Sequence, residues 1–221
     1  MSSALETVGL RFSYDDEPML ESVSLSIAEG EFAAIVGDNG VGKSTLMNLV
    51  LGNLAPNAGT IRLFGDSIER NDHHADIAYV SQDAVRGYRG FPTTIEELVS
   101  VHCAHLKSKA SIGDLLALVG LEGQRGRALR ELSGGQLQRV GILAALIKNA
   151  RLILLDEPTT GIDRSFSAEL YGILRRLCDE GRTVVMITHH LSEAVPFIDR
   201  ALHLSDGRAS ELDLSKVGAD L

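Results

Sequence analysis

A glycine-rich loop between a short apolar run and a helical segment constrains this chain more than any other feature. Residues 37–44 read GDNGVGKS, which matches the pattern G-x-x-x-x-G-K-S/T in full. The preceding run, FAAIV (32–36), is typical of a buried strand, and KSTLMNLVL (43–51) has the spacing of a helix with one apolar face. The glycines let backbone N–H groups turn toward one anion, and the helix N-terminus adds a favourable dipole. The sequence therefore predicts a strand–loop–helix unit that binds phosphate.

Residues of this loop have distinct expected roles toward a nucleotide. A lysine at this point of the pattern reaches the β- and γ-phosphates, and the hydroxyl that follows it ligates Mg²⁺. These residues are Lys43 and Ser44. An ordinary glycine-rich turn is the alternative, but such a turn does not require a buried strand before it and a helix after it. The further residues expected to contact the nucleotide are Gly37, Asn39, Gly40, Gly42 and Thr45.

A second segment, LILLDEP (152–158), supplies the carboxylates that a magnesium nucleotide requires. Its apolar run is typical of a buried strand, and the strand ends in Asp156 and Glu157, where ligands bind in open α/β sheets. We expect Asp156 to hold Mg²⁺ and Glu157 to act as the general base for an attacking water. An acidic pair before a proline turn would be the simpler interpretation of this segment alone. The phosphate loop argues against it, because Mg²⁺ would otherwise be half-coordinated.

Strand and helix patterns alternate at both ends of the chain, which predicts an α/β fold with a mainly parallel sheet and an antiparallel β edge. ESVSLSIA (21–28) alternates as a half-buried strand does, and Asp206-Gly207 lies between two alternating segments, as in a hairpin. The middle of the chain is helix-rich, and both Thr93 with Glu96 and Thr94 with Glu97 have the spacing of a capping box. We predict one domain over 1–221, with a sheet core over about 1–84 and 150–221 and an inserted helical lobe over about 85–149.

Composition limits the classes of partner. The chain has 221 residues, 44% of them hydrophobic, and a formal net charge of −9, which argues against binding nucleic acid. Two cysteines, Cys103 and Cys178, have no paired spacing, and the N-terminus has no signal-peptide pattern, so a reduced, cytosolic setting is expected. The longest apolar runs are far shorter than the roughly 18–20 residues that cross a bilayer. Any work at a membrane would therefore need a partner that spans it.

A second glycine-containing helix start occurs in LSGGQLQRV (132–140). Ser133 and Gln136 have the spacing of a capping box, which is the simplest interpretation. A cap does not need the two glycines Gly134 and Gly135, and each glycine costs about 1 kcal/mol relative to alanine in a helix. The glycines are explained if a phosphate must approach the backbone at this point.

These three motifs together resemble the ATP-binding cassette (ABC) ATPases, and the resemblance covers the whole chain. LSGGQ is the signature motif of that family, and it is specific when it accompanies GDNGVGKS and LLDEP. The resemblance implies a P-loop ATPase fold and two subunits paired head to tail. Each Mg-ATP would then lie between the phosphate loop of one subunit and the signature of the other. The signature residues that would act across the dimer are Ser133, Gly134, Gly135 and Gln136.

Four further positions match the family. Tyr14 resembles the aromatic residue that stacks on adenine, although a tyrosine in a strand can also belong to a core. Gln82 resembles the glutamine that senses Mg²⁺ and the attacking water, the alternative being a plain loop residue. Asp163 resembles the aspartate of a loop that crosses the dimer, and it is also placed to cap the following helix. His189 resembles the histidine that contacts the γ-phosphate; the next residue is usually aspartate but is His190 here, and strand alternation favours His189.

The segments FPTTIEELV, GID and YGILRRLCDEGRTVVMITHH resemble the ATPases of bacterial zinc and manganese importers. Heme, cobalt and lipid-export ATPases share related patterns, so these cargoes stay open. The resemblance implies a separate integral membrane permease, an extracytoplasmic solute-binding protein, and a place on the cytoplasmic face of the membrane. A soluble ABC ATPase without a transport role and a non-catalytic nucleotide-binding regulator are the alternatives.

Histidines outside these motifs have simpler interpretations. His102 and His105 are three residues apart on one predicted helix, beside Cys103, and could share a metal ion. Packing or contact with a membrane subunit is favoured, because two or three nearby donors do not form a closed metal site. His73 and His74 lie in a polar stretch, which favours a solvated loop.

Overall fold

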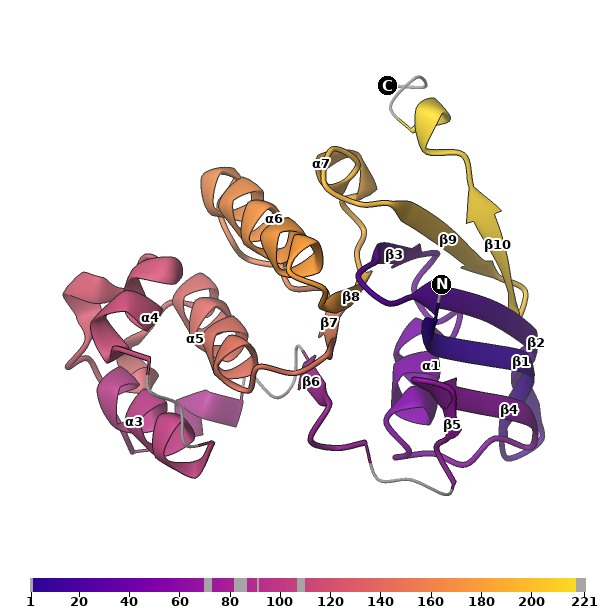
Figure 1. The fold of residues 1–221 in the computed structure, drawn as a ribbon, viewed down its shortest axis with the longest axis horizontal. Coiled ribbons are helices and arrows are strands. Elements are labelled where there is room, and N and C mark those ends of the chain that lie inside the picture. The colour runs from indigo at the N-terminus through magenta and orange to yellow at the C-terminus, as the bar shows by residue number, and fades with distance from the viewer. Residues whose placement is uncertain (1, 70–72, 82–86, 91, 107–109, 218–221) are drawn as a thin grey trace.

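The computed structural model describes residues 2–69, 73–81, 87–90, 92–106 and 110–217. Within these ranges, six strands form one sheet in the order β10-β9-β3-β8-β7-β6. All neighbours in this sheet pair in parallel except β9 and β10, so the predicted mainly parallel sheet with an antiparallel edge is confirmed (Figure 1). The strands are β3 (Phe32–Val36), β6 (Ile77–Val80), β7 (Leu152–Asp156), β8 (Thr183–Ile187), β9 (Arg200–Ser205) and β10 (Arg208–Leu212).

The antiparallel edge is the predicted hairpin. Ser205 pairs with Arg208, and the two turn residues Asp206 and Gly207 have positive φ angles of 48° and 66°. A two-residue turn with both φ angles positive matches the twist of the strands it joins, which is why Asp-Gly favours this turn.

A second, four-stranded antiparallel sheet has the order β2-β1-β4-β5. Its strands are β1 (Ser3–Tyr14), β2 (Glu17–Ala28), β4 (Ala58–Leu63) and β5 (Asp66–Ser67). Val23, Leu25 and Ile27 of β2 are buried, as the alternation predicted. The antiparallel part is thus larger than the predicted edge. The sequence pattern of β1 did not indicate a strand, because shifts in its pairing with β2 between residues 3 and 13 interrupt the period of two.

The helix that follows the phosphate loop, α1 (Lys43–Val50), joins the two sheets. Its residues Leu46, Met47, Leu49 and Val50 belong to one core cluster with the second sheet and with side chains of β3, β7 and β8. This cluster covers one face of the parallel sheet and fixes the start of α1 against the end of β3.

The opposite face of the parallel sheet packs against helices, which extend away from the second sheet (Figure 1). One cluster of buried side chains runs from β7 and β8 through α5 and α6 to α3 and α4. Of the two predicted capping boxes, the one formed by Thr94 and Glu97 begins α3. No helix among the residues described has the length and apolar character to span a bilayer. The helices are α3 (Ile95–His105), α4 (Ile112–Leu118), α5 (Gly134–Ile147), α6 (Arg164–Asp179) and α7 (Leu191–Ala194), with 3₁₀ turns at Tyr88–Gly90, Glu122–Gln124, Leu129–Glu131 and Leu214–Lys216.

Candidate active site

The order of the parallel strands brings the sequence motifs together. β3, β8, β7 and β6 are neighbours in that order, and their carboxyl ends meet at the same edge of the sheet. Gly37 follows β3, His189 lies just after β8, and Asp156 ends β7. Gln82 is the second residue after the end of β6 but lies outside the described residues. Three described segments far apart in the sequence therefore meet at one edge.

The phosphate loop is closed around its lysine. Lys43 Nζ donates hydrogen bonds of 2.8 Å to the carbonyl oxygens of Gly37 and Asp38, and Lys43 is only 6% exposed. Gly37 must be glycine, because a Cβ there would lie 2.3 Å from the carbonyl oxygen of Leu204. Asn39 and Gly40 lie exposed at the tip of the loop. The loop thus surrounds an ammonium group with backbone atoms and leaves its outer surface open.

Burial sets the electrostatics of this lysine. Desolvation lowers the pKa of Lys43, and the nearby carboxylates of Glu157, Asp156 and Asp38 oppose that shift. A buried cation that is paired here with carbonyl oxygens gains when an anion arrives, because a charge–charge contact replaces weaker dipolar ones. The arrangement therefore favours a phosphate group over the open loop.

Ser44 and Asp156 provide two oxygen donors at one point. The Ser44 hydroxyl donates a hydrogen bond of 2.9 Å to Asp156 Oδ2, joining the start of α1 to the end of β7. No group of three or more histidine, cysteine or acidic side chains suited to a metal ion occurs among the described residues. Two protein oxygens fit Mg²⁺, which keeps several waters and takes phosphate oxygens as its other ligands.

Glu157 is held by three contacts. Its backbone has a φ of 51°, unusual for a residue other than glycine, and its N–H donates a 3.0 Å hydrogen bond to the carbonyl of Ile187 on β8. The side-chain Oε1 lies 3.0 Å from His189 Nε2, and Oε2 accepts a 3.1 Å hydrogen bond from the Thr160 hydroxyl. The carboxylate borders a cavity of about 420 Å³ that Ser44 and Asp156 also line. Glu157 is thus positioned against the same space as the two candidate Mg²⁺ ligands.

The two adjacent histidines have different places. His189 reaches Glu157, whereas the backbone N–H of His190 donates to the Thr188 hydroxyl at the start of α7. The structure therefore places His189 against Glu157, although both histidines lie beyond the end of β8 at Ile187, where strand alternation no longer applies.

Tyr14 lies at the end of β1, beside the start of α1. Its hydroxyl lies 3.5 Å from the Thr45 hydroxyl oxygen, and its ring packs edge-on against Phe12. The residue is 47% exposed, so the interpretation as a core tyrosine is wrong. An exposed aromatic face next to a phosphate loop is available for stacking.

The second glycine-containing motif forms the start of α5. The Ser133 hydroxyl accepts from the backbone N–H of Gln136, and the Gln136 side chain accepts from the backbone N–H of Ser133, which confirms the predicted capping box. Ser133, Gly135 and Gln136 line a cavity of about 430 Å³ with residues 161–163. The residues described around this cavity do not overlap with those around the Ser44–Asp156 cavity. Within one chain, the fold does not bring the motif to the phosphate loop.

Asp163 caps α6, as its position predicted. Oδ1 accepts from the backbone N–H of Phe166 at 3.0 Å and from the Ser165 hydroxyl, and Oδ2 accepts from Arg139 at 2.9 Å. The hydrogen bond from Phe166, followed by that from Ser165, lowers the pKa of Asp163 to about 2. The carboxylate is therefore ionised at any working pH.

The family of the chain follows from residues 20–160, which match the model of the ABC transporter family over more than half of the chain. This chain belongs to the ABC transporter family. It is 36% identical over 207 residues to the high-affinity zinc uptake system ATP-binding protein ZnuC of Bacillus subtilis, covering 89% of this chain and 88% of that protein. It is 38% identical over 198 residues to the aliphatic sulfonates import ATP-binding protein SsuB of Cupriavidus necator, covering 88% and 64%.

Solved structures have the same fold. The dimeric ATP-binding cassette MJ0796, bound to ADP and Pi, has a TM-score of 0.80 and 28% identity, covering 95% of this chain and 98% of that one. The chain is thus the ATP-binding and ATP-hydrolysing subunit of an ABC transporter.

The sequence did not predict one contact of this ABC ATPase, and it wrongly predicted the exposure of one histidine. Arg139, which binds Asp163, was not predicted, because a lone arginine on a helix belongs to no recognised pattern. His73 was expected in a solvated loop, and this was wrong for its side chain, which is 10% exposed. Its Nδ1 lies 3.3 Å from Asp76 Oδ2, and its ring packs against Phe64, so a polar and an aromatic contact hold it inside.

The two signature glycines of this ABC ATPase should respond differently to a methyl group. A Cβ at Gly135 would lie 2.7 Å from the carbonyl oxygen of Gly161, whereas a Cβ at Gly134 would meet no atom within 4 Å. We expect Gly135→Ala to lower the free energy of unfolding by about 1–3 kcal/mol, as overpacking does. Gly134→Ala, the matched control, should raise it by up to about 1 kcal/mol, because alanine loses less backbone entropy in a helix. Urea unfolding of the nucleotide-free chains measures both, and equal values would refute the close contact.

Proposed function

We propose that this ABC ATPase drives uptake of a divalent transition metal, zinc or manganese, through a separate membrane permease. The observation that carries the proposal is the similarity to a zinc uptake ATPase along nearly the full length of both chains. The similar identity to a sulfonate import ATPase favours a second candidate, an importer of another cargo. A cytoplasmic position beneath the permease and an extracytoplasmic solute-binding protein belong to the same proposal.

The proposed ATP site is shared between two copies of the chain. In each copy, the signature motif and the phosphate loop face separate cavities, so neither alone encloses a nucleotide. A head-to-tail dimer would place the Ser133–Gln136 signature of one copy over the phosphate loop of the other, with Asp163 beside the junction. The dimeric relative bound to ADP and Pi supports this assembly. Tyr14 would stack on the adenine of the ATP held by its own phosphate loop.

Hydrolysis would follow from the residues at the sheet edge. Lys43 exchanges the carbonyls of Gly37 and Asp38 for oxygens of the β- and γ-phosphates. Glu157 accepts a proton from water, the resulting hydroxide attacks the γ-phosphorus, and the bond from phosphorus to the ADP oxygen breaks. His189 and Thr160 hold the carboxylate in place during the transfer. Mg²⁺, held by Ser44 and Asp156, would offset negative charge on the phosphates, and Gln82 is proposed to sense it and the water.

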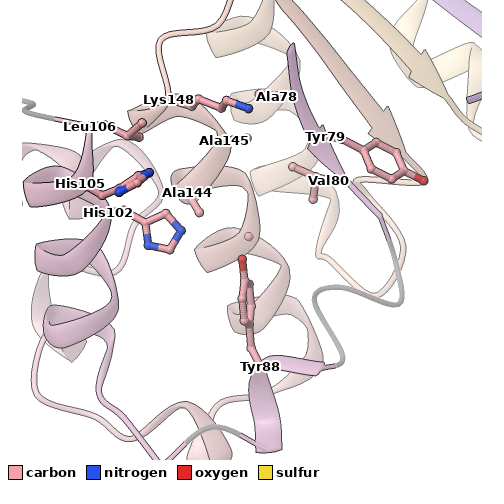
Figure 2. Close-up of a pocket in the computed structure, with 11 residues that line it drawn as sticks. Ala78, Tyr79, Val80, Tyr88, His102, His105, Leu106, Ala144, Ala145 and Lys148 are labelled. Atoms are coloured by element: carbon pink, nitrogen blue, oxygen red, sulfur yellow. The ribbon is translucent and has the colours of Figure 1, made fainter. Parts of the chain in front are cut away.

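The proposed permease contact is a cavity of about 320 Å³ on the helical side of the chain. His102 and His105 of α3 face it across from Tyr88 and from the α5 residue Ala144 (Figure 2). Tyr79 of β6 borders this cavity and also the Ser44–Asp156 cavity. A permease segment seated here would therefore touch the strand that leads to Gln82, which links docking to the nucleotide.

The metal interpretation of the α3 histidines has less support than the permease contact. Cys103 is buried in the helical core, whereas His102 and His105 line the cavity. His102 Nδ1 lies 2.9 Å from the carbonyl oxygen of Leu98, which engages one of its two ring nitrogens. We propose that these histidines contact the permease rather than a metal ion.

The cargo can be tested in cells that lack this protein. Cells grown at limiting metal should contain less zinc or manganese than wild-type cells by elemental analysis. A plasmid that encodes the chain should restore the metal content, and one that encodes Lys43→Ala should not, because the variant cannot bind the phosphates. Unchanged metal content together with a loss of growth on sulfonate as the sulfur source would replace the proposal with the second candidate.

A further inference from the structure

One guanidinium joins three helices beside the signature motif. Arg139 lies on α5, six residues after Ser133. Its Nη1 donates to the carbonyl of Val119 at the end of α4 at 3.2 Å, and its Nη2 donates to Asp163 Oδ2 at 2.9 Å. The guanidinium also stacks 3.6 Å from the centre of the Phe166 ring on α6. A planar fork with fixed donors can hold all three partners at once, which a lysine cannot do.

The backbone around Arg139 leaves little room for movement. Gly135 of the signature lies against the carbonyl oxygen of Gly161, with space for no side chain between them. A Cβ at Gly120 would lie 2.9 Å from Arg139 Nη1, so the turn after α4 also closes on the guanidinium. The signature and the Asp163 loop are therefore in direct contact, and Arg139 spans the contact.

Stability alone does not explain this network. The Asp163 side chain is 60% exposed, and an ion pair with so exposed a partner contributes little to stability. The network is better explained by the orientation that it gives to the Asp163 carboxylate. Oδ1 accepts hydrogen bonds from Phe166 and Ser165, and Oδ2 accepts one from Arg139. All three contacts together hold the carboxylate in one orientation relative to α5.

We propose that Arg139 is a positioning residue that holds the Ser133–Gln136 signature and the Asp163 loop at a fixed spacing. The two elements then engage the nucleotide of the second copy together. Arg139 lines the same cavity as the signature and acts through its contacts with Val119, Asp163 and Phe166. The inference rests on the shared ATP site proposed above. Loss of Arg139 should therefore weaken the closing of the dimer and leave nucleotide binding by the phosphate loop of the same chain unchanged.

The test uses chains that carry Glu157→Gln, which are expected to bind ATP and to hydrolyse it only slowly. Adding Arg139→Gln should raise the protein concentration for half-maximal ATP-dependent dimerisation at least about tenfold, because a misplacement of ~1 Å is costly in an assembled site. Light scattering measures the dimer. Affinity for a fluorescent ATP analogue, measured at concentrations where the chain is monomeric, should stay within about twofold, because the phosphate loop is untouched.

Arg175→Gln is the matched control. Arg175 also lies on a helix and pairs with two acids, Asp179 at 3.0 Å and Asp199 at 2.8 Å, and its side chain is 26% exposed against 19% for Arg139. Arg175 lies outside both cavities described at the active site. We expect Arg175→Gln to leave dimerisation unchanged. Arg139→Lys, which keeps the charge but not the planar fork, should dimerise as poorly as Arg139→Gln.

Each outcome bears on the proposal. Dimerisation of Arg139→Gln at the parent concentration, full rescue by Arg139→Lys, or an equal defect in Arg175→Gln would overturn it. A parallel loss of nucleotide affinity in the monomer would also overturn it, since the effect would then reach the phosphate loop. If the parent Glu157→Gln chain forms no dimer in ATP, the shared site itself fails, which is a separate result from a defect confined to Arg139→Gln.

Discussion

A Glu157→Gln variant is expected to bind ATP with little change and to hydrolyse it roughly 10²- to 10⁴-fold more slowly, the range for loss of a general base. Glutamine has nearly the same shape as glutamate, and its amide oxygen can still accept the Thr160 hydrogen bond. The amide cannot take a proton from water, so the nucleotide should remain intact and hold two copies together. Release of phosphate measures turnover, and light scattering in Mg-ATP measures the trapped dimer.

Glu193→Gln provides the control for this experiment. Glu193 is an acid on α7 whose side chain is 30% exposed and lies 3.4 Å from Arg164, away from the Ser44–Asp156 cavity. Loss of the Glu193 charge should change turnover by less than about twofold, because a surface ion pair contributes little energy. Undiminished turnover in Glu157→Gln would remove this residue as the base.

Two inactive variants are expected to recover activity when mixed. Lys43→Ala removes the ammonium that meets the phosphates. Ser133→Asp keeps an oxygen that can cap α5 but places a negative charge where the phosphate of the other copy would lie. Each variant alone should lose hydrolysis by at least ~100-fold, because both pockets of its dimer are damaged. A mixed dimer contains one pocket with an intact lysine and an intact serine, so an equal mixture should regain up to about one quarter of wild-type activity.

The control mixture pairs Lys43→Ala with the double variant Lys43→Ala, Ser133→Asp. Both phosphate loops are then damaged in every dimer, and no recovery is expected. Steady-state phosphate release over a range of mixing ratios distinguishes the two mixtures. Hydrolysis at the full rate by Ser133→Asp, or by wild-type chains that light scattering finds only as monomers in ATP, would contradict the shared pocket.

Local chemistry made several features predictable. The capping boxes at Thr94 and Ser133 each close within three residues, so spacing alone indicates them. The Asp206-Gly207 hairpin depends on two φ angles that few other residue pairs adopt. The meeting of Ser44 with Asp156 was also predictable, although 112 positions separate them, because parallel strands end at one edge of the sheet.

Other features required the folded chain. Strand β1 has pairing shifts that interrupt its alternation, so no pattern indicated it or the extent of the second sheet. The polar stretch around His73 predicted a solvent-exposed side chain, yet contacts with Asp76 and Phe64 cover it. These outcomes depend on which surfaces face each other after folding, and that information is spread over the whole chain.

Local motifs therefore specified the chemistry of this ABC ATPase: which residues can hold phosphate, magnesium and a proton. Packing decided their spatial relation. It brought His189 to Glu157, separated the signature from the phosphate loop of the same chain, and placed Arg139 between three helices. The physical reason is the separation in sequence between the residues that interact. A cap or a tight turn is stabilised by neighbours in sequence, whereas these contacts join residues about 20 or more positions apart and exist only when the sheet and helices have docked.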